Sequence, residues 1–163
     1  MSKITPTLWF NGGVEEAAEF YVSLLPESRV ESINRSPIDT PSGPEGQVLT
    51  AIITLAGQRF CLLNGGPIFP QTEAVSFMIE TDSQEETDRL WNAIVNNGGK
   101  ESACGWCKDK WGVSWQVTPR RLLELTTDKD TERAKRAMAS MMTMRKIDIA
   151  AIERAAAGEG VDA

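Results

Sequence analysis

The alternation of apolar and polar residues predicts a strand, a helix and three further strands in the first part of the chain. Apolar residues recur at helical spacing over Val14–Leu25, with three glutamates opposite, and Pro26 ends this helix. The segment 36–46 holds three prolines and two glycines, which predicts a loop. Short apolar or β-rich runs predict strands at Ile4–Phe10, Arg29–Arg35, Gln47–Leu55 and Arg59–Leu63.

The second part of the chain follows nearly the same order. Alternation over Ala74–Thr81 predicts a strand, and Ser83 with Glu86 forms a capping box that opens a helix reaching Asn97. Two more strands are expected, at Glu101–Cys107 and Val113–Thr118. The apolar pattern of the first helix, Phe20-Tyr21-x-x-Leu24, returns 70 residues later as Leu90-Trp91-x-x-Ile94. The order β-α-β-β-β followed by β-α-β-β therefore predicts an internal duplication.

A different pattern occupies residues 128–158, which we predict to be helical. One side of the first helix carries Ala134, Met138, Met141, Met142 and Arg145. Asp148 is placed to cap a second helix, Ile149–Ala157, which Gly158 ends. We interpret this tail as a packing appendage, and a subunit interface is the alternative because methionine side chains fill irregular apolar gaps.

Strand alternation also locates a candidate site. In the strand at 74–81, Val75, Phe77 and Ile79 suit the side that packs on a helix, and Ser76, Met78 and Glu80 point the other way. The same division in the first and last strands predicts one polar and aromatic cleft lined by Thr7, Trp9, Ser76, Glu80, Ser114 and Gln116. The alternative is that these are solvent-facing positions of an antiparallel sheet.

Composition removes several classes of function. The chain has 163 residues, enough for one domain or two small halves, and a net charge of −6, which argues against nucleic acid and anionic membranes as partners. It contains no histidine, which excludes a Ser-His-Asp or Cys-His catalytic pair and a histidine-ligated zinc. No apolar run is long enough to span a bilayer and no signal-peptide pattern opens the chain, so we expect a cytoplasmic protein.

Three short motifs have alternative interpretations. Cys104-Gly105-Trp106-Cys107 is a C-x-x-C pair, but it is predicted at the end of a strand, where buried or half-buried thiols are the simpler interpretation than redox or metal chemistry. The paired glycines match neither a dinucleotide fingerprint nor a P-loop. The charged segment 108–112 is either an ordinary turn or a loop at the mouth of a pocket.

The sequence resembles a known family in several segments. They are Thr7-Leu8-Trp9-Phe10-Asn11-Gly12 with Glu15-Glu16-Ala17 and Phe20-Tyr21, Leu63-Asn64-Gly65-Gly66-Pro67, Cys104-Gly105-Trp106, the long run from Lys108 to Pro119, and Lys146-Ile147-Asp148-Ile149 with Glu153-Arg154-Ala155. Together they resemble the PhnB-like family labelled 3-demethylubiquinone-9 3-methyltransferase. This family belongs to the vicinal oxygen chelate superfamily, with glyoxalase I and the bleomycin-resistance proteins.

The resemblance implies an α+β fold. It consists of two βαβββ-type modules that form a curved, mixed or antiparallel sheet around a cleft, followed by C-terminal helices, and it is usually a homodimer. We expect one such domain over 1–163, with module one at 3–67, module two at 74–119 and the helical tail at 128–158.

Metal enzymes of the superfamily bind a divalent ion through His, Gln or Glu. The matching positions here are Thr5 or Thr7, Ser76 and Gln116. Hydroxyls are weak neutral ligands, and Ile68 stands where the family often has histidine after Asn-Gly-Gly-Pro. We therefore expect no tightly bound metal and no cofactor.

Three functional hypotheses follow. The first is a protein that binds a small molecule in a metal-free cleft lined by Thr7, Trp9, Asn64, Ser76, Trp106, Lys108, Ser114 and Gln116, with Trp111 as a further aromatic contact. The second is an enzyme of the same fold whose acid or base is Glu80, with Lys108 or Asp109 as the next candidates. The third is the methyltransferase of the family label, placed last because the chain has no Gly-rich loop between a strand and a helix for S-adenosylmethionine.

Overall fold

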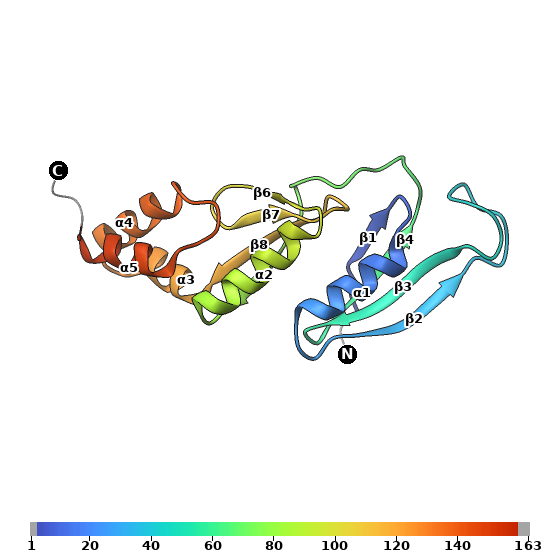
Figure 1. The fold of residues 1–163 in the computed structure, drawn as a ribbon, viewed down its shortest axis with the longest axis horizontal. Coiled ribbons are helices and arrows are strands. Elements are labelled where there is room, and N and C mark those ends of the chain that lie inside the picture. Colours follow the sequence, from blue (N-terminus) through green and yellow to red (C-terminus); the bar gives the residue numbers. More distant parts are fainter. Residues whose placement is uncertain (1–2, 160–163) are drawn as a thin grey trace. The chain divides into compact units, whose positions relative to one another are not determined.

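The structure is a computed structural model and describes residues 3–159. Within that range it has five helices and two four-stranded mixed sheets, which confirms the α+β class (Figure 1). The chain divides into two compact units between Gln71 and Thr72. The elements are β1 (Thr7–Phe10), α1 (Val14–Leu24), β2 (Arg29–Arg35), β3 (Val48–Leu55), β4 (Gln58–Asn64), β5 (Ser76–Thr81), α2 (Gln84–Asn96), β6 (Lys100–Glu101), β7 (Trp106–Lys108), β8 (Ser114–Pro119), α3 (Arg120–Thr126), α4 (Thr131–Met141) and α5 (Ile149–Ala157).

The first unit is a sheet with one helix packed on it. Its strand order is β1-β4-β3-β2, with β1 parallel to β4 and the other pairs antiparallel. The apolar stripe of α1 includes Ala17, Tyr21 and Leu24, all buried, and it packs on a sheet face that presents Ile53 and Leu62. The predicted helix and strands of this unit are confirmed, with shorter ends at β1 and β3.

The second unit repeats this topology with strand order β5-β8-β7-β6, β5 being parallel to β8. Ser83 caps α2 by accepting a hydrogen bond from the Glu86 amide (3.1 Å), which confirms the predicted start. The Glu86 carboxylate returns to the amide of Asp82 (2.8 Å), one residue earlier than in a standard capping box. Val75 lies before the strand and is exposed, so its predicted place on the apolar face is wrong.

The single strand predicted at Glu101–Cys107 is wrong, because the chain reverses within it. Cys104 and Gly105 both have left-handed backbones, with φ of 58° and 81°, and they turn the chain from β6 into β7. The second unit is therefore also βαβββ, so the duplication is more complete than the sequence indicated. The C-x-x-C pair consequently spans this turn and β7 instead of ending a strand.

The repeat of 70 residues is visible in the buried positions of the two helices. Tyr21 corresponds to Trp91 and Leu24 to Ile94, and all four side chains are buried. Because both helices bury the same stripe on equivalent sheets, the short apolar motif of the sequence records a real structural repeat.

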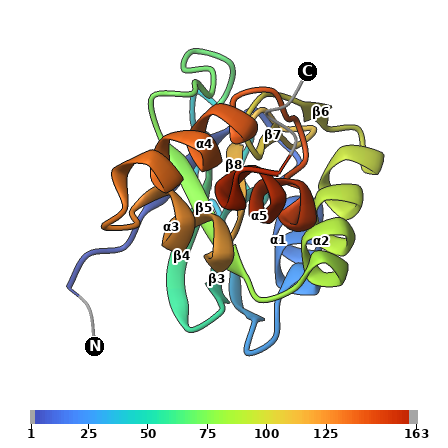
Figure 2. The same ribbon diagram turned by 90° about the vertical axis from the view of Figure 1, so that its left-hand side faces the viewer.

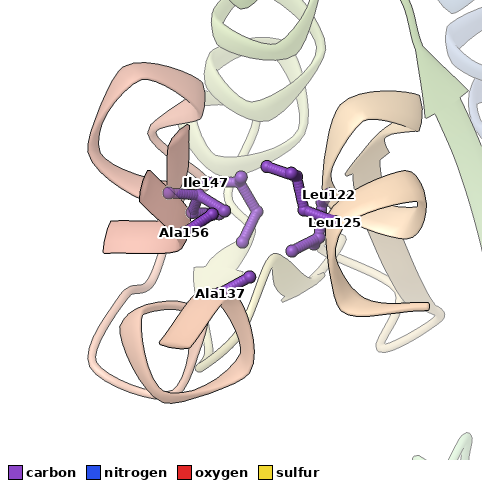
Figure 3. Packing of buried hydrophobic residues seen from close by; sticks show 6 residues of the cluster. Leu122, Leu125, Ala137, Ile147 and Ala156 are labelled. Atoms are coloured by element: carbon purple, nitrogen blue, oxygen red, sulfur yellow. The ribbon is translucent and has the colours of Figure 1, made fainter. Parts of the chain in front are cut away.

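Three helices follow the second sheet and gather around one another beside α2 (Figure 2). The first of them, α3, has no counterpart among the predicted elements. Side chains from all three helices, and Ile147 between α4 and α5, point toward one another in a small apolar core (Figure 3). Its buried members are Leu122, Leu125, Ala137, Ile147, Ile152 and Ala156.

The buried side of α4 differs from the predicted methionine stripe. Ala137 is buried, and Met141 packs against the core, but Met138 and Met142 are exposed (43% and 63%). Ala137 suits this position because a small side chain lets α5 pack closely against α4. The predicted helix Ile149–Ala157, capped by Asp148 and ended by Gly158, is confirmed.

The helical extension is attached to the second sheet through backbone hydrogen bonds. The amides of Cys104 and Gly105 donate to the carbonyls of Met144 (2.8 Å) and Arg145 (2.7 Å). Glu101 adds an ion pair to Arg145 (3.2 Å), and Asp88 adds one to Lys146 (2.8 Å). The turn before β7 is therefore held by the segment that joins α4 to α5.

No helix among residues 3–159 combines the length and apolar character needed to cross a membrane.

Candidate functional site

Trp9 is the centre of the predicted site residues in the first unit. Its indole N–H donates to the Gly66 carbonyl (2.8 Å), and Phe69 meets the ring edge-on, with centroids 4.9 Å apart. A Cβ on Gly65 would lie 2.2 Å from the ring. The glycine is therefore needed for the indole to lie flat against the chain after β4.

Thr7 and Asn64 lie in the same unit but have different surroundings. Thr7 is exposed, two residues before Trp9 on β1, so both side chains project from one face. Asn64 is buried: its Oδ1 accepts from the Gly12 amide (3.0 Å) and its Nδ2 donates to the Val48 carbonyl (3.2 Å). The first bond fixes the turn between β1 and α1, the second ties the end of β4 to the start of β3, and a ligand-binding role for Asn64 stays a prediction.

The second unit brings five of the predicted residues together. Ser114 on β8 is the register partner of both Ser76 on β5 and Lys108 on β7, and Gln116 is the partner of Trp106. Register partners share a face of the sheet, so these side chains lie on the side opposite α2. Gln116 Nε2 donates to Ser76 Oγ (2.8 Å), which ties β8 to β5 at the centre of the group.

Two polar groups of this cluster differ in how they are satisfied. Ser114 is 1% exposed, and its hydroxyl has no hydrogen-bond partner among residues 3–159. Lys108 is half-buried and forms an ion pair with Glu73. The hydrogen bond from Lys108 lowers the pKa of the Glu73 carboxyl.

Glu80, the leading catalytic candidate, is exposed at the far end of β5. Its carboxylate pairs with Arg120 Nε (3.2 Å), which also meets Asp82 at 3.2 Å. The acid or base role proposed for Glu80 stays a prediction.

Asp109, another acid or base candidate, organises the turn between β7 and β8. It is 4% exposed, and its Oδ1 accepts hydrogen bonds from the amides of Trp111 (2.9 Å) and Val113 (3.0 Å). Its Oδ2 accepts from the indole N–H of the buried Trp115 (2.9 Å). This pattern favours the turn interpretation of the charged segment 108–112.

The two cysteines of the C-x-x-C pair lie in different surroundings. Cys107 is buried in β7, where desolvation, with smaller contributions from Asp109 and Glu101, raises the pKa of its thiol to about 12. Cys104 is half-buried in the preceding turn, with its Sγ 3.7 Å from Met142 Sδ. Since a thiol reacts and binds metals as its thiolate, Cys107 is a buried structural thiol near neutral pH.

The residues present do not fit the divalent metal that the resemblance implies. The positions that match the metal ligands are Thr7, Ser76 and Gln116, and the last two are hydrogen-bonded to each other. All three offer neutral donors, whereas hard divalent ions favour carboxylates. Among the residues that the structure describes, no three His, Cys, Asp or Glu side chains gather where they could hold an ion.

A cavity of about 860 Å³ in the first unit had no signal in the sequence. It lies where β2, β3 and β4 meet the hairpin turn at Gly57. Within it, Glu31 accepts a hydrogen bond from Thr54 Oγ1 (2.6 Å) and pairs with Arg29 (2.6 Å), and these contacts, Thr54 first, lower the pKa of its carboxyl. The lining residues are Glu27, Arg29, Glu31, Thr54, Gly57, Gln58 and Arg59. Loop and turn residues supply part of the cavity wall. The cavity could not be predicted from the sequence, because strand alternation gives no information about such residues.

Several solved structures are similar to this chain. The PhnB protein from Bacillus cereus aligns with 35% identity and a TM-score of 0.65, covering 72% of this chain and 99% of that one. Protein PA1353 from Pseudomonas aeruginosa aligns with 24% identity and a TM-score of 0.60, over 73% and 98% of the two chains. A glyoxalase/bleomycin resistance protein from Albidiferax ferrireducens T118 aligns with 16% identity and a TM-score of 0.42, over 70% and 96%.

Among curated proteins, none matches this chain. Residues 2–118 match the family described as 3-demethylubiquinone-9 3-methyltransferase, and the match covers β1 to β8 except Pro119. The helices α3, α4 and α5 lie beyond it. With more than half of its length matched, the chain belongs to the 3-demethylubiquinone-9 3-methyltransferase family, to which its sequence motifs had pointed.

Proposed function

We propose that the protein binds an organic small molecule on the face of the second sheet opposite α2, without a metal ion. The observation that carries this proposal is the cluster on β5, β7 and β8, where a buried hydroxyl without a partner lies beside an ammonium group and an ordered amide. Buried polar groups in folded proteins are nearly always hydrogen-bonded, so such a group is a natural contact for a ligand.

Trp106 supplies the apolar part of this cluster. It is half-buried next to Gln116, and its own backbone is fixed by bonds from the Ser102 amide (2.9 Å) and to the Ala103 carbonyl (3.0 Å). Gln116 donates to Ser76 and presents its carbonyl oxygen as an acceptor. A flat apolar surface beside a few oriented polar groups is typical of small-molecule sites.

The ligand-binding role is tested with the Gln116→Ala and Trp106→Ala variants. A metabolite retained in native mass spectra of the gently purified protein is the ligand for the titrations. Either variant should weaken binding at least fivefold, because each removes a direct contact, while the melting temperature changes little. Asp82→Asn, on the exposed turn after β5, is the matched control. Unchanged affinity in both variants would place the ligand elsewhere.

We further propose that the protein is a metal-free cytoplasmic homodimer, and the same spectra test its metal content and its dimeric state. The resemblance to the vicinal oxygen chelate superfamily supports the dimer. The neutral side chains of Thr7, Ser76 and Gln116 support the absence of a tightly bound metal ion. The expected mass is twice that of the chain without a bound ion. Stoichiometric zinc, nickel or iron in protein prepared without chelators would contradict it.

Two further experiments separate the enzyme hypotheses. Glu80→Gln should abolish turnover of the identified ligand if Glu80 is the acid or base, and unchanged turnover removes that role. Calorimetric titration with S-adenosylmethionine should show no binding, because the short loop between β1 and α1 has only Gly12 and Gly13 and lacks the third glycine of a nucleotide-binding loop.

A further inference from the structure

Three hydrogen-bond donors lie side by side across β7, β8 and β5. Lys108 is the antiparallel register partner of Ser114, and Ser76 is its parallel partner on the other side. Partners on neighbouring strands have Cβ atoms about 4.5–5.5 Å apart on the same face. One ammonium group and two hydroxyls therefore form a short row on the face opposite α2.

The hydrogen bonds of this row are incomplete within the chain. Ser114 Oγ is buried and has no partner among residues 3–159. Ser76 Oγ accepts from Gln116, which leaves its own hydroxyl hydrogen available for another acceptor. The row has donors left over, which points to a ligand rich in acceptor oxygens.

Glu73 supplies an acceptor to one end of the row only. Its carboxylate pairs with Lys108, from the exposed segment just before β5, and its side chain is 63% exposed. It leaves Ser114 without a bond. A carboxylate that replaced it could give one oxygen to Lys108 and the other to Ser114, since each oxygen accepts independently.

We propose that Lys108, Ser114 and Ser76 bind a carboxylate of the ligand, and that Glu73 occupies Lys108 until that carboxylate displaces it. This inference rests on the proposed function, because it assigns a ligand class to the same face. Replacing the Glu73 carboxylate on Lys108 by the ligand's carboxylate changes the free energy of that ion pair little. The additional hydrogen bond from Ser114 then favours the ligand. Glu73 thus acts as an internal competitor.

The test uses sodium acetate as the probe, with the ionic strength held constant with sodium chloride. Backbone amide resonances of Lys108 and Ser114, and the side-chain amide of Gln116, are followed by NMR. These signals should shift and saturate. Glu73→Gln should tighten acetate binding about 1.4- to 5-fold, because it removes the exposed ion pair that competes for Lys108. Glu85→Gln, exposed on α2, makes the same change in net charge and should leave the affinity unchanged.

Two variants test the row itself. Ser114→Ala should weaken acetate binding about tenfold, as expected for a hydrogen bond to a charged group, while the denaturation midpoint stays equal or rises because the unpartnered hydroxyl is gone. Lys108→Met should abolish the saturable shift. Shifts at Ser114 that never saturate, or equal affinity in Ser114→Ala, would overturn the carboxylate site.

The inference and the proposed function can fail separately. A metabolite that depends on Gln116 and Trp106, but binds equally well to Lys108→Met and Ser114→Ala, overturns the carboxylate row and leaves the ligand-binding role intact. If Glu73→Gln binds acetate no better than the unmodified protein, competition between Glu73 and the ligand carboxylate for Lys108 is refuted.

Discussion

Asp109→Asn is the most informative substitution for the architecture of the second unit. The side chain keeps its shape, and its remaining oxygen can still accept from the amides of Trp111 and Val113. The new amide group then faces the indole N–H of Trp115, where two donors meet. Rotating the amide would restore that bond but break both backbone bonds.

The expected cost follows from the bond that is lost. A hydrogen bond to a charged acceptor contributes about 1.5–3 kcal/mol, and Asp109 and Trp115 are both buried, so water cannot replace the acceptor. We expect a decrease of about 2–3 kcal/mol in the free energy of unfolding. At about 2–4 °C per kcal/mol for a chain of this size, the melting temperature should fall by about 4–12 °C.

Urea denaturation, monitored by circular dichroism, measures this cost. Trp115→Phe completes a double-mutant cycle with Asp109→Asn. Phenylalanine removes the indole N–H, so in that background Asp109→Asn should cost at least 1 kcal/mol less. Asp82→Asn, whose ion pair with Arg120 is exposed, should change stability by less than about 1 kcal/mol. An equal cost of Asp109→Asn in both backgrounds would refute the role assigned to the Trp115 bond.

Three other predictions concern packing and protonation. Gly65→Ala places a Cβ 2.2 Å from the Trp9 ring, so it should displace the indole, lower stability by about 1–3 kcal/mol and change the near-ultraviolet circular dichroism; an unchanged spectrum would contradict this. Leu125→Ala should cost about 2–5 kcal/mol in urea denaturation because it opens the core between α3, α4 and α5, whereas Leu123→Ala on the same helix, which lies outside that core, should cost much less. The pKa of Cys107 is about 12 in the folded protein and 9.0 as a free thiol, so the folded state retains the proton longer and the free energy of unfolding should fall as pH rises from 9 toward 12. Cys107→Ala should lose that part of the pH dependence, and iodoacetamide at pH 8 should modify Cys107 only after unfolding; rapid labelling of the native protein would contradict its burial.

The fold was predictable where buried residues are periodic. The apolar stripe of α1 and the capping residues of α2 identified both helices. The strands at 29–35 and 48–55 were long enough to be recognised by their β-rich composition. The turn at 102–105 was missed because β6 and β7 have only two and three residues, too few for alternation to appear. It also contains a non-glycine residue, Cys104, in the left-handed region, which no sequence rule anticipates.

The candidate site divides in the same way. Alternation in β5 and β8 placed Ser76 and Gln116 on one face, and the structure joins them with a hydrogen bond. The partner of Lys108 could not be predicted, since Glu73 belongs to no helix or strand and has no periodic position. The structural role of Asp109 depends on Trp115 six residues later, and spacing alone does not indicate that contact.

The backbone bonds from Cys104 and Gly105 to the segment after α4 have a consequence for how this protein differs from its relatives. The family match ends at residue 118, yet two amides of the turn leading into β7 take their acceptors from residues 144 and 145. A chain without this extension must provide other acceptors for that turn. The C-terminal helical extension therefore helps to hold β7, the strand that carries Trp106 and Lys108, in place. Deleting them, or adding them to a shorter relative, would require the turn to be redesigned as well.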